Sequence, residues 1–305
     1  MPTHILSSKG QWYSGIVIIW FRAHYADDPR DWNNIREFEG NYHPLLGYYQ
    51  SDDPDILKQQ LHWIRRAGVD LIVYDAFPTG KRSLTDLSKD KTLQLLLHEL
   101  NNQTNEIRKL KLCLWLEKYL SNPTVEEYNY ALEYIRQNIS NYNFYFRYKG
   151  RPLLLVYLNG ENRAIDEIEL HNYYFEIRRV RPFYSDVWSY IEDYPQRLQK
   201  ECISACPGFD AYLENAYIAK YVHKEEALNL EEVYKNAPRA ERKDGTYYER
   251  QLYWAKQANP DIIFISGWND WQYSNQIEPA VEYEFKYVDL TAKCLGRWEE
   301  TAPYR

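Results

Sequence analysis

The stretch IIFISGWNDWQYSNQIEP, residues 262–279, decides which fold the chain is expected to have. It opens with an apolar run over residues 262–265, which is typical of a strand buried on both faces in a parallel sheet. After Gly267 the sequence turns abruptly polar and aromatic. In an α/β protein the residues just past the carboxyl end of a strand lie at the mouth of the sheet or barrel, where substrates bind.

The side chains after Gly267 are of the kinds that bind and cleave sugars. Carboxylates carry out acid–base chemistry, amides bind hydroxyls, and flat rings stack on pyranose faces. The residues concerned are Trp268, Asn269, Asp270, Trp271, Gln272, Tyr273, Asn275, Gln276 and Glu278. A strand that ends in a polar turn would give a similar pattern, but the density of these side chains favours a functional site.

The rest of the chain alternates between apolar runs and helical patterns. The runs predict strands at 15–21, 69–74, 111–116, 153–157, 173–178, 186–191, 202–206 and 262–266. Apolar residues at helical spacing predict helices at 55–67, 90–103, 124–138 and 245–258. We expect long loops at 22–54 and 211–244, and short or missing helices after the fifth and sixth strands. Eight strands in this order predict an α/β fold, a (β/α)8 TIM barrel that is somewhat irregular in its second half, with residues 1–305 as one domain.

Composition and charge exclude several classes of function. The net charge of −7 argues against a nucleic-acid partner, which would need a basic patch. The four Cys and seven His are dispersed and show no metal-binding spacing, so we expect no metal and no cofactor. No apolar run approaches the ~20 residues of a membrane span, and the N-terminus lacks the pattern of a signal peptide. These features predict a cytoplasmic protein; they leave the oligomeric state open.

In a barrel, the polar residues that follow each strand meet at one mouth. Asp75 and Glu117 each follow an apolar strand directly. The other candidates at strand ends are His24, Tyr25, Tyr119, Asn159, Arg178, Arg179, Glu192 and Asp210. Any one of them is equally consistent with an ion pair or a helix cap, but their shared position at strand ends favours a site.

Several segments, in order along the chain, resemble the endo-α-mannosidase family of glycoside hydrolases and its bacterial relatives from polysaccharide-biosynthesis loci. They are HPLLGYYQSDDP at 43–54, AGVD at 67–70, YFRYKGRP at 145–152, PGFD at 207–210, and WNDW at 268–271 with QIEP at 276–279. The last of these is similar to the family's Asn-Glu-Trp-x-Glu-Gly…Ile-Glu-Pro segment. The resemblance covers roughly residues 15–280 and implies a (β/α)8 barrel that acts on an oligosaccharide or polysaccharide.

The resemblance also implies two catalytic carboxylates three residues apart, of which this chain keeps one. The first, which assists at the sugar 2-hydroxyl, corresponds to Asp270, and the second, the general acid/base, corresponds to Tyr273. Ser274 follows, where the family has Gly. Asp in place of Glu withdraws the carboxylate by about 1.5 Å, and a Tyr with a pKa of ~10 is a poor acid/base near neutral pH. The family's mechanism therefore cannot run unchanged here.

Three hypotheses follow. In the first, the chain hydrolyses a glycosidic bond with a different carboxylate pair. In the second, the barrel binds a glycan or acts in polysaccharide assembly without cleaving it. In the third, it is an unrelated barrel enzyme, which fold alone does not exclude. For the first, the predicted catalytic residues are Asp270, Glu117 and Glu278, with Glu192 as another possible second carboxyl; the predicted substrate-binding residues are Tyr25, Asp75, Tyr119, Glu192, Trp268, Asn269, Trp271 and Tyr273.

Overall fold

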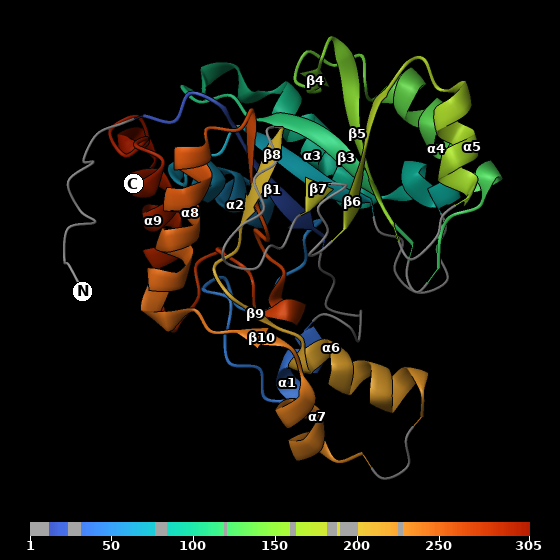
Figure 1. The fold of residues 1–305 in the computed structure, drawn as a ribbon. Coiled ribbons are helices and arrows are strands. Elements are labelled where there is room, and N and C mark those ends of the chain that lie inside the picture. The colour runs from blue at the N-terminus through green and yellow to red at the C-terminus, as the bar shows by residue number, and fades with distance from the viewer. Residues whose placement is uncertain are drawn as a thin grey trace.

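Eight parallel strands form the centre of the molecule. The computed structural model describes residues 12–23, 32–76, 84–118, 121–158, 163–181, 188–189, 201–224 and 228–305. The strands are β1 (Ile16–Arg22), β2 (Leu71–Ala76), β3 (Lys111–Leu116), β5 (Arg151–Tyr157), β6 (Glu176–Arg181), β7 (Trp188–Ser189), β8 (Cys202–Ala205) and β11 (Ile262–Ile265). They are hydrogen-bonded in the order β7-β6-β5-β3-β2-β1-β11-β8 (Figure 1), and β7 also lies against β8. The curled sheet thus confirms the prediction of a (β/α)8 barrel.

Helices flank this sheet, as the alternating pattern predicts (Figure 1). They are α2 (Pro54–Arg66), α3 (Lys91–Asn101), α4 (Val125–Asn138), α5 (Arg163–His171), α8 (Thr246–Ala258) and α9 (Lys286–Cys294). Local sequence explains where two of them begin: the Asp53 carboxylate accepts from the backbone N–H groups at the start of α2, and Thr124 and Glu127 form a capping box at the start of α4. Among the described residues, no helix has the length and apolar character needed to cross a bilayer.

The predicted strands and helices are confirmed, with boundary shifts of a few residues, but the two predicted long loops contain structure. The first includes α1 (Asn34–Glu37); the second includes α6 (Tyr212–Tyr217), the π-helical turn η4 (Ile218–Val222), α7 (Leu230–Asn236) and β10 (Arg239–Ala240), which pairs antiparallel with β9 (Phe209–Asp210). These elements are short and α7 buries no residue, so they leave little apolar periodicity in the sequence.

Shorter elements complete the fold. They are the two-residue strand β4 (Arg147–Tyr148), which pairs with β5, and the 3-10 turns η2 (Leu84–Lys89), η3 (Gln103–Asn105), η5 (Lys243–Gly245), η6 (Trp271–Tyr273) and η7 (Ala302–Tyr304). The segments after the fifth and sixth strands, where short or missing helices are expected, lie largely outside the described residues. The single-domain assignment for residues 1–305 stays a prediction.

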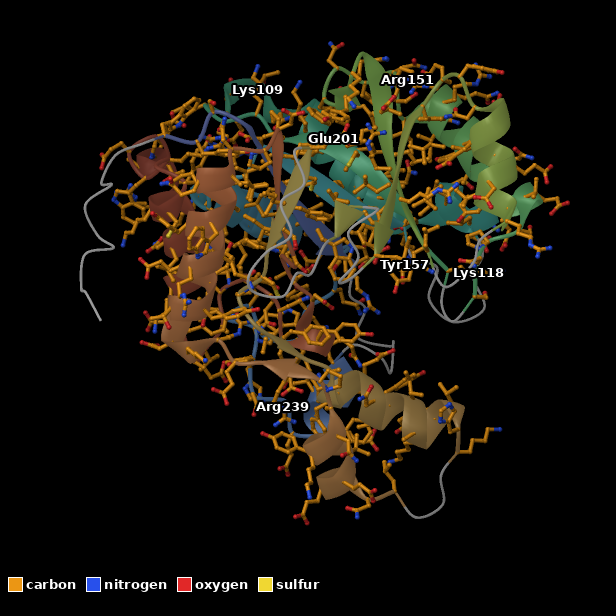
Figure 2. The ribbon with its side chains drawn as sticks, viewed as in Figure 1. Lys109, Lys118, Arg151, Tyr157, Glu201 and Arg239 are labelled. Carbon is orange, nitrogen blue, oxygen red and sulfur yellow. The ribbon has the colours of Figure 1, made fainter. Side chains whose placement is uncertain are left out.

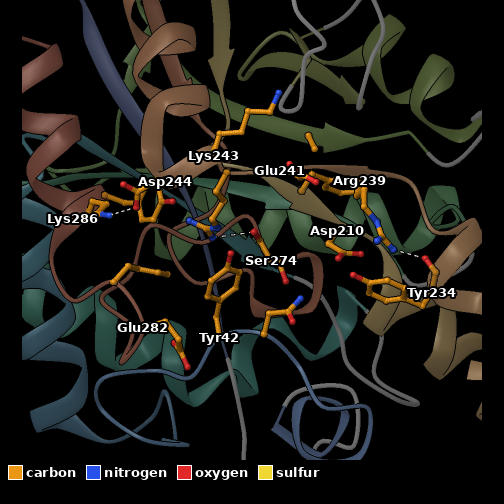
Figure 3. A pocket seen from close by; sticks show the side chains of 16 residues that line it. Tyr42, Asp210, Tyr234, Arg239, Glu241, Lys243, Asp244, Ser274, Glu282 and Lys286 are labelled. Carbon is orange, nitrogen blue, oxygen red and sulfur yellow. Dashed lines mark hydrogen bonds and ion pairs between the residues drawn. The ribbon is translucent and has the colours of Figure 1, made fainter. Parts of the chain in front are cut away.

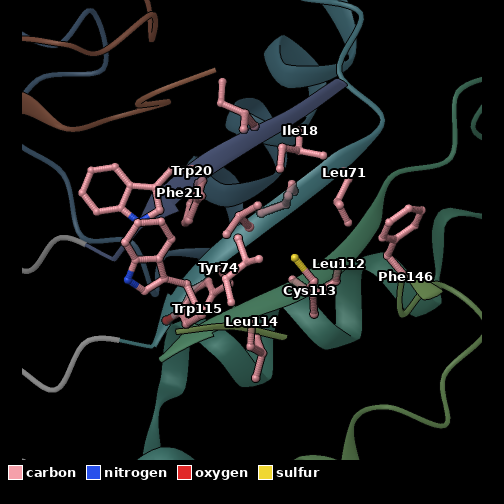
Figure 4. Packing of buried hydrophobic residues seen from close by; sticks show 14 of the residues in the cluster. Ile18, Trp20, Phe21, Leu71, Tyr74, Leu112, Cys113, Leu114, Trp115 and Phe146 are labelled. Carbon is pink, nitrogen blue, oxygen red and sulfur yellow. The ribbon is translucent and has the colours of Figure 1, made fainter. Parts of the chain in front are cut away.

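Aromatic side chains from different strands meet inside the barrel (Figure 4). The ring of Trp115 on β3 lies 5.8 Å from that of Trp20 on β1 and 5.9 Å from that of Tyr157 on β5, measured between centroids. It also packs edge-on against Phe264 on β11, at 6.2 Å. Two of these strands, β1 and β11, are not neighbours of β3 in the sheet. The rings therefore meet across the interior that the strands enclose.

Cys113, Cys202 and Cys206 are buried and pack as small apolar residues. Burial raises the pKa of the Cys206 thiol to about 12, which keeps it protonated near neutral pH.

The carboxylate of Asp70 ties together the amino-terminal end of the barrel. Its Oδ2 accepts from the backbone N–H of Val17 at 2.9 Å and pairs with Arg297 at 2.6 Å. Its Oδ1 pairs with Arg108 at 2.7 Å. Arg297 is almost fully buried and also donates to the carbonyl oxygens of Gly15 and Gly68, so one carboxylate and one guanidinium join the starts of β1 and β2 to the C-terminal segment.

Replacing Asp70 should therefore destabilise the whole fold. We expect Asp70→Asn to lower the free energy of unfolding by about 2–3 kcal/mol, because it leaves the buried Arg297 charge without its partner. Urea denaturation followed by circular dichroism measures this. The control is Asp166→Asn, which removes a carboxylate that is 57% exposed and paired with Arg179 on the surface, where we expect less than about 1 kcal/mol. Equal unfolding midpoints for the two variants would contradict the structural role of Asp70.

Candidate active site

The mouth of the barrel lies at the carboxyl ends of the parallel strands. In Figure 2, Tyr157 and Lys118 mark this end, while Arg151 and Glu201 mark the opposite one. The short elements α1, α6, α7, β9 and β10 lie beyond the mouth, below the barrel in Figure 1. The segment after β11 stands between the barrel and these elements, and η6 within it packs against both α1 and α6.

The segment after β11 folds back on itself as a tight loop. Gly267 has φ +95°, and a Cβ there would lie 2.5 Å from the Asn275 side-chain oxygen and 2.9 Å from its carbonyl oxygen, so only glycine fits. The backbone N–H of Ile277 donates to the Gly267 carbonyl at 2.9 Å, which closes the loop. Ser274 adopts a left-handed conformation with φ +51°, at the position where the family resemblance has Gly.

A fully buried carboxylate, that of Glu278, anchors this loop. Its Oε2 accepts from the Tyr49 hydroxyl at 2.7 Å and from the Trp271 indole N–H at 2.8 Å, and its Oε1 accepts from the Gln60 side-chain amide at 2.8 Å. Burial, followed by the charge of Glu278, raises the pKa of Tyr49 well above its usual value and keeps that hydroxyl a donor. Because both of its oxygens accept hydrogen bonds from donors of the protein, Glu278 fits the role of an anchor better than the predicted catalytic one.

Three of the predicted sugar contacts are buried in the structure. Trp268 is fully buried in the main hydrophobic core. Asn269 bridges the loop to the end of β1: its side-chain oxygen accepts from the Arg22 N–H at 2.9 Å, and its side-chain N–H donates to the Arg22 carbonyl at 2.7 Å. Trp271 is 2% exposed and packs against Trp32. These side chains hold the loop in place and offer no open face to a sugar.

Tyr273, in contrast, is only partly buried and has carboxylates around it. Its ring stacks on Phe209 with centroids 5.4 Å apart. Burial raises the pKa of Tyr273 well above its usual value, and the charges of Glu214, Asp270 and Glu117 raise it further. Tyr273 therefore stays protonated, and carboxylates from three separate elements act on its hydroxyl.

Each of these carboxylates is held by a different part of the fold. Asp270 lies in the loop after β11 and is 1% exposed. Glu117 follows β3, is half-buried, and accepts a hydrogen bond from the Trp115 indole N–H at 2.8 Å. Glu214 lies on α6, which packs against η6, and is 4% exposed. Two predicted residues, Asp270 and Glu117, thus act on the same side chain, Tyr273, and so does Glu214, which was not predicted.

Sequence reasoning missed Glu214 and Arg22. Glu214 falls in the predicted loop 211–244, and only its position shortly after the seventh strand could have indicated it. Arg22 is the last residue of β1 and pairs in register with Asp75 on β2. Both are buried, so a basic and an acidic side chain stand on neighbouring strands at the mouth, where Asp75 is predicted.

Other predicted residues lie elsewhere. Arg178 pairs with Glu176 at 2.8 Å and Glu201 at 2.9 Å, at the amino-terminal ends of the strands. Arg179 pairs with Glu169 and Asp166 on α5, and Asp210 lines a separate pocket. Tyr25, Tyr119 and Glu192, together with His24 and Asn159, lie outside the described residues. Within the part of the chain that the structure describes, no three His, Cys, Asp or Glu side chains come together as a metal site would require.

Comparison with protein families and curated proteins agrees with this geometry. The model of "Glycosyl hydrolase family 99" matches residues 9–166, which is just over half of the chain and ends before the loop after β11. The chain is 22% identical over 310 residues to the "Glycoprotein endo-alpha-1,2-mannosidase-like protein" of Danio rerio, covering 90% of this chain and 67% of that protein. It is also 22% identical over 274 residues to the Homo sapiens protein of that name, covering 79% of this chain and 58% of that protein. The chain thus spans about 58–67% of the length of these relatives.

Solved structures show the same fold. The glycoside hydrolase family 99 endo-α-mannosidase from Bacteroides thetaiotaomicron superposes with a TM-score of 0.67 at 16% identity, over 94% of this chain and 98% of that one. A "Glycoside hydrolase-like protein" superposes with a TM-score of 0.60 at 12% identity, over 92% and 94% of the two chains. At these identities the likeness concerns the fold.

The anchoring role of Glu278 can be tested by removing its charge. We expect Glu278→Gln to lower the free energy of unfolding by about 2–3 kcal/mol, because the new amide N–H₂ would face one or more of the buried donors that now bind the carboxylate. Chemical denaturation measures the change. Glu282→Gln, at a side chain that is 32% exposed and paired with His43, is the matched control and should change stability by less than about 1 kcal/mol. If both variants unfold at the same denaturant concentration, Glu278 does not anchor the loop.

Proposed function

Because the chain belongs to glycosyl hydrolase family 99, we propose that it binds a glycan at the mouth of its barrel and hydrolyses a glycosidic bond there with a modified carboxylate pair. The observation that carries this proposal is the group of carboxylates around Tyr273, formed by Asp270, Glu117 and Glu214. Glycoside hydrolysis needs two carboxyl groups that flank the scissile bond, about 5–10 Å apart. The mouth supplies such carboxylates from separate elements, the loop after β11 and the end of β3.

We assign the two catalytic roles to Asp270 and Glu117. Asp270 keeps the first position of the family pair, which the resemblance associates with assistance at the 2-hydroxyl. Glu117 is half-buried, and the indole N–H of Trp115 fixes one of its oxygens, so its carboxyl is oriented at the mouth. It would donate a proton to the leaving oxygen and then take one from the attacking water.

Tyr273 and Glu214 support this pair in different ways. With its raised pKa, Tyr273 remains protonated and can donate a hydrogen bond to a sugar oxygen, while its stacking on Phe209 fixes the ring. The charge of Glu214 favours the protonated form of that hydroxyl. Arg22 and Asp75, at the ends of neighbouring strands, would bind further sugar hydroxyls.

The names of the relatives suggest which substrate to test first. The curated relatives are named endo-α-1,2-mannosidase-like, so we propose an α-linked mannose polymer or oligosaccharide as the first substrate class. A cytoplasmic location and the absence of a nucleic-acid partner stay predictions.

A second candidate function is glycan binding without cleavage, for example in polysaccharide assembly. The specific observation that favours it is Tyr273 itself, which occupies the position of the acid/base and is held neutral by burial and by the neighbouring carboxylates. In that case the mouth would keep its affinity for a glycan and lack a proton donor of suitable pKa.

The first test replaces the proposed catalytic carboxylate. We expect Asp270→Asn to reduce sugar release at least about a hundredfold while leaving glycan affinity within about threefold, because the amide keeps the shape and loses the charge. Mass spectrometry of products from mannan, glucan and bacterial polysaccharides measures release, and calorimetry measures binding. Asp166→Asn, which changes an exposed carboxylate on α5, is the control and should behave as the wild type. Unchanged release by Asp270→Asn would show that the catalytic residue lies elsewhere.

The second test separates cleavage from binding alone. The double variant Asp270→Glu and Tyr273→Glu recreates the spacing of the family pair. If the wild-type protein binds the glycan without releasing sugar, we expect this variant to gain measurable release, because it regains a carboxyl at the acid/base position. A wild-type protein that already cleaves, and whose Glu117→Gln variant loses at least about a hundredfold, would instead exclude the binding-only function.

A further inference from the structure

A pocket of about 410 Å³ lies beside the loop after β11 (Figure 3). Phe209 and Ser274 line this pocket, and Phe209 stacks on Tyr273, which faces the catalytic carboxylates. The remaining walls come from β10, the turn η5, the start of α9 and residues 41–42. We call it the Arg242 pocket, because Arg242 lies in its wall and is a buried cationic side chain.

Arg242 has hydrogen-bonding capacity that the protein does not use. It is 7% exposed, and its Nη2 donates to the carbonyl oxygens of Ser274 at 2.9 Å and Gln276 at 2.7 Å. The rings of Tyr42, Tyr283 and Tyr287 surround the guanidinium at 4.4–5.1 Å. Among the described residues, its Nε and Nη1 have no hydrogen-bond acceptor. Buried donors of this kind are normally satisfied, so these two groups indicate a ligand or bound water.

Acceptors in the same pocket complement these donors. Asp210 uses Oδ1 to accept from the backbone N–H of Tyr212 at 2.9 Å, and its Oδ2 has no donor within the described part of the chain. Glu241 is exposed at the rim of the pocket and has no ion-pair partner among the described residues. A ligand with both donor and acceptor groups would therefore match this wall. An alcohol hydroxyl can donate a hydrogen bond and accept one.

The charges in the pocket are balanced, which argues against an anionic ligand. Asp244 pairs with Lys286, and Glu282 pairs with His43. The pocket wall as a whole holds four carboxylates, Asp210, Glu241, Asp244 and Glu282, and four cations, Arg239, Arg242, Lys243 and Lys286. An anion placed between Arg242 and Asp210 would meet repulsion as well as attraction.

Aromatic rings supply the apolar part of the wall. Tyr42 points into the pocket beside Ser274 in Figure 3, and Tyr234 lies at the opposite side beneath Arg239. The Arg239 guanidinium stacks over the Tyr234 ring at 3.9 Å and fixes its orientation. Flat rings beside paired donors and acceptors match the two kinds of surface that a pyranose presents.

We propose that the Arg242 pocket is a second, non-catalytic binding site for a neutral saccharide unit. The sugar hydroxyls donate to Asp210 and accept from Arg242, and a ring face packs on tyrosine. The proposed function supplies only the expected class of ligand, a sugar. The pocket itself contains none of the proposed catalytic carboxylates. Its position next to Tyr273, through Phe209, would let it hold a glycan chain whose other end lies in the mouth.

The experiment counts binding sites with a simple probe. Calorimetry with methyl α-D-mannopyranoside should give two sites per wild-type chain. Asp210→Asn should weaken one of them about tenfold, because the amide loses the charge-assisted hydrogen bond. Tyr234→Ala should also weaken that site, since it removes a stacking surface. Asp166→Asn, a surface carboxylate on α5, is the control and should leave both sites intact.

The outcomes distinguish this proposal from the proposed function. Two sites, of which one responds to Asp210→Asn and the other to Tyr273→Ala, support the second site even if the protein cleaves no glycan. One site that responds only to Tyr273→Ala overturns it. If the Asp210-dependent site binds methyl glucuronoside more tightly than the neutral mannoside, the assignment of a neutral sugar is overturned. If it binds inorganic phosphate as tightly as the mannoside, the site is an adventitious anion site and the proposal is also overturned.

Discussion

The arrangement of the carboxyl end of the barrel depends on one buried carboxylate, that of Glu278. Glu278 has no exposed surface, and its two oxygens accept hydrogen bonds from Tyr49, Gln60 and Trp271. These donors come from the loop before α2, from α2 itself and from η6, so the carboxylate joins elements that are far apart in the sequence. A buried charge is tolerated only when it is hydrogen-bonded, and these bonds fix the loop after β11 to the elements around it.

That conformation decides which side chains reach the mouth. The turn at Gly267 and the backbone bridge made by Asn269 direct Trp268 and Trp271 into the interior and leave Tyr273 partly exposed. The segment after β11 thus combines side chains that hold the loop, Trp268, Asn269 and Trp271, with Tyr273, which is partly exposed. In the proposed function, a tyrosine at this position changes the chemistry of the mouth while the support of the loop stays intact.

The two ends of the barrel divide stability and function between them. At the amino-terminal end, Asp70 and Arg297 link the starts of β1 and β2 to the C-terminal segment. At the carboxyl end, the charges of Asp270, Glu117 and Glu214 all act on Tyr273. Like charges brought together in this way cost stability, and such an arrangement is characteristic of sites where protons are moved. The short elements beyond the mouth contribute Glu214 and the walls of the Arg242 pocket.

The sequence by itself determined the barrel and the position of its mouth. Apolar runs such as 262–265 and 111–116 are buried strands whose period is visible locally, and the residues that follow them, Asp270 and Glu117, lie at strand ends in any barrel. Only the tertiary structure decided what each polar side chain does there. Glu278 and Glu117 look alike in the sequence, yet one is enclosed by three donors and the other is half-exposed. Glu214 became a neighbour of Tyr273 because α6 packs on η6, a contact between distant segments that no local pattern encodes.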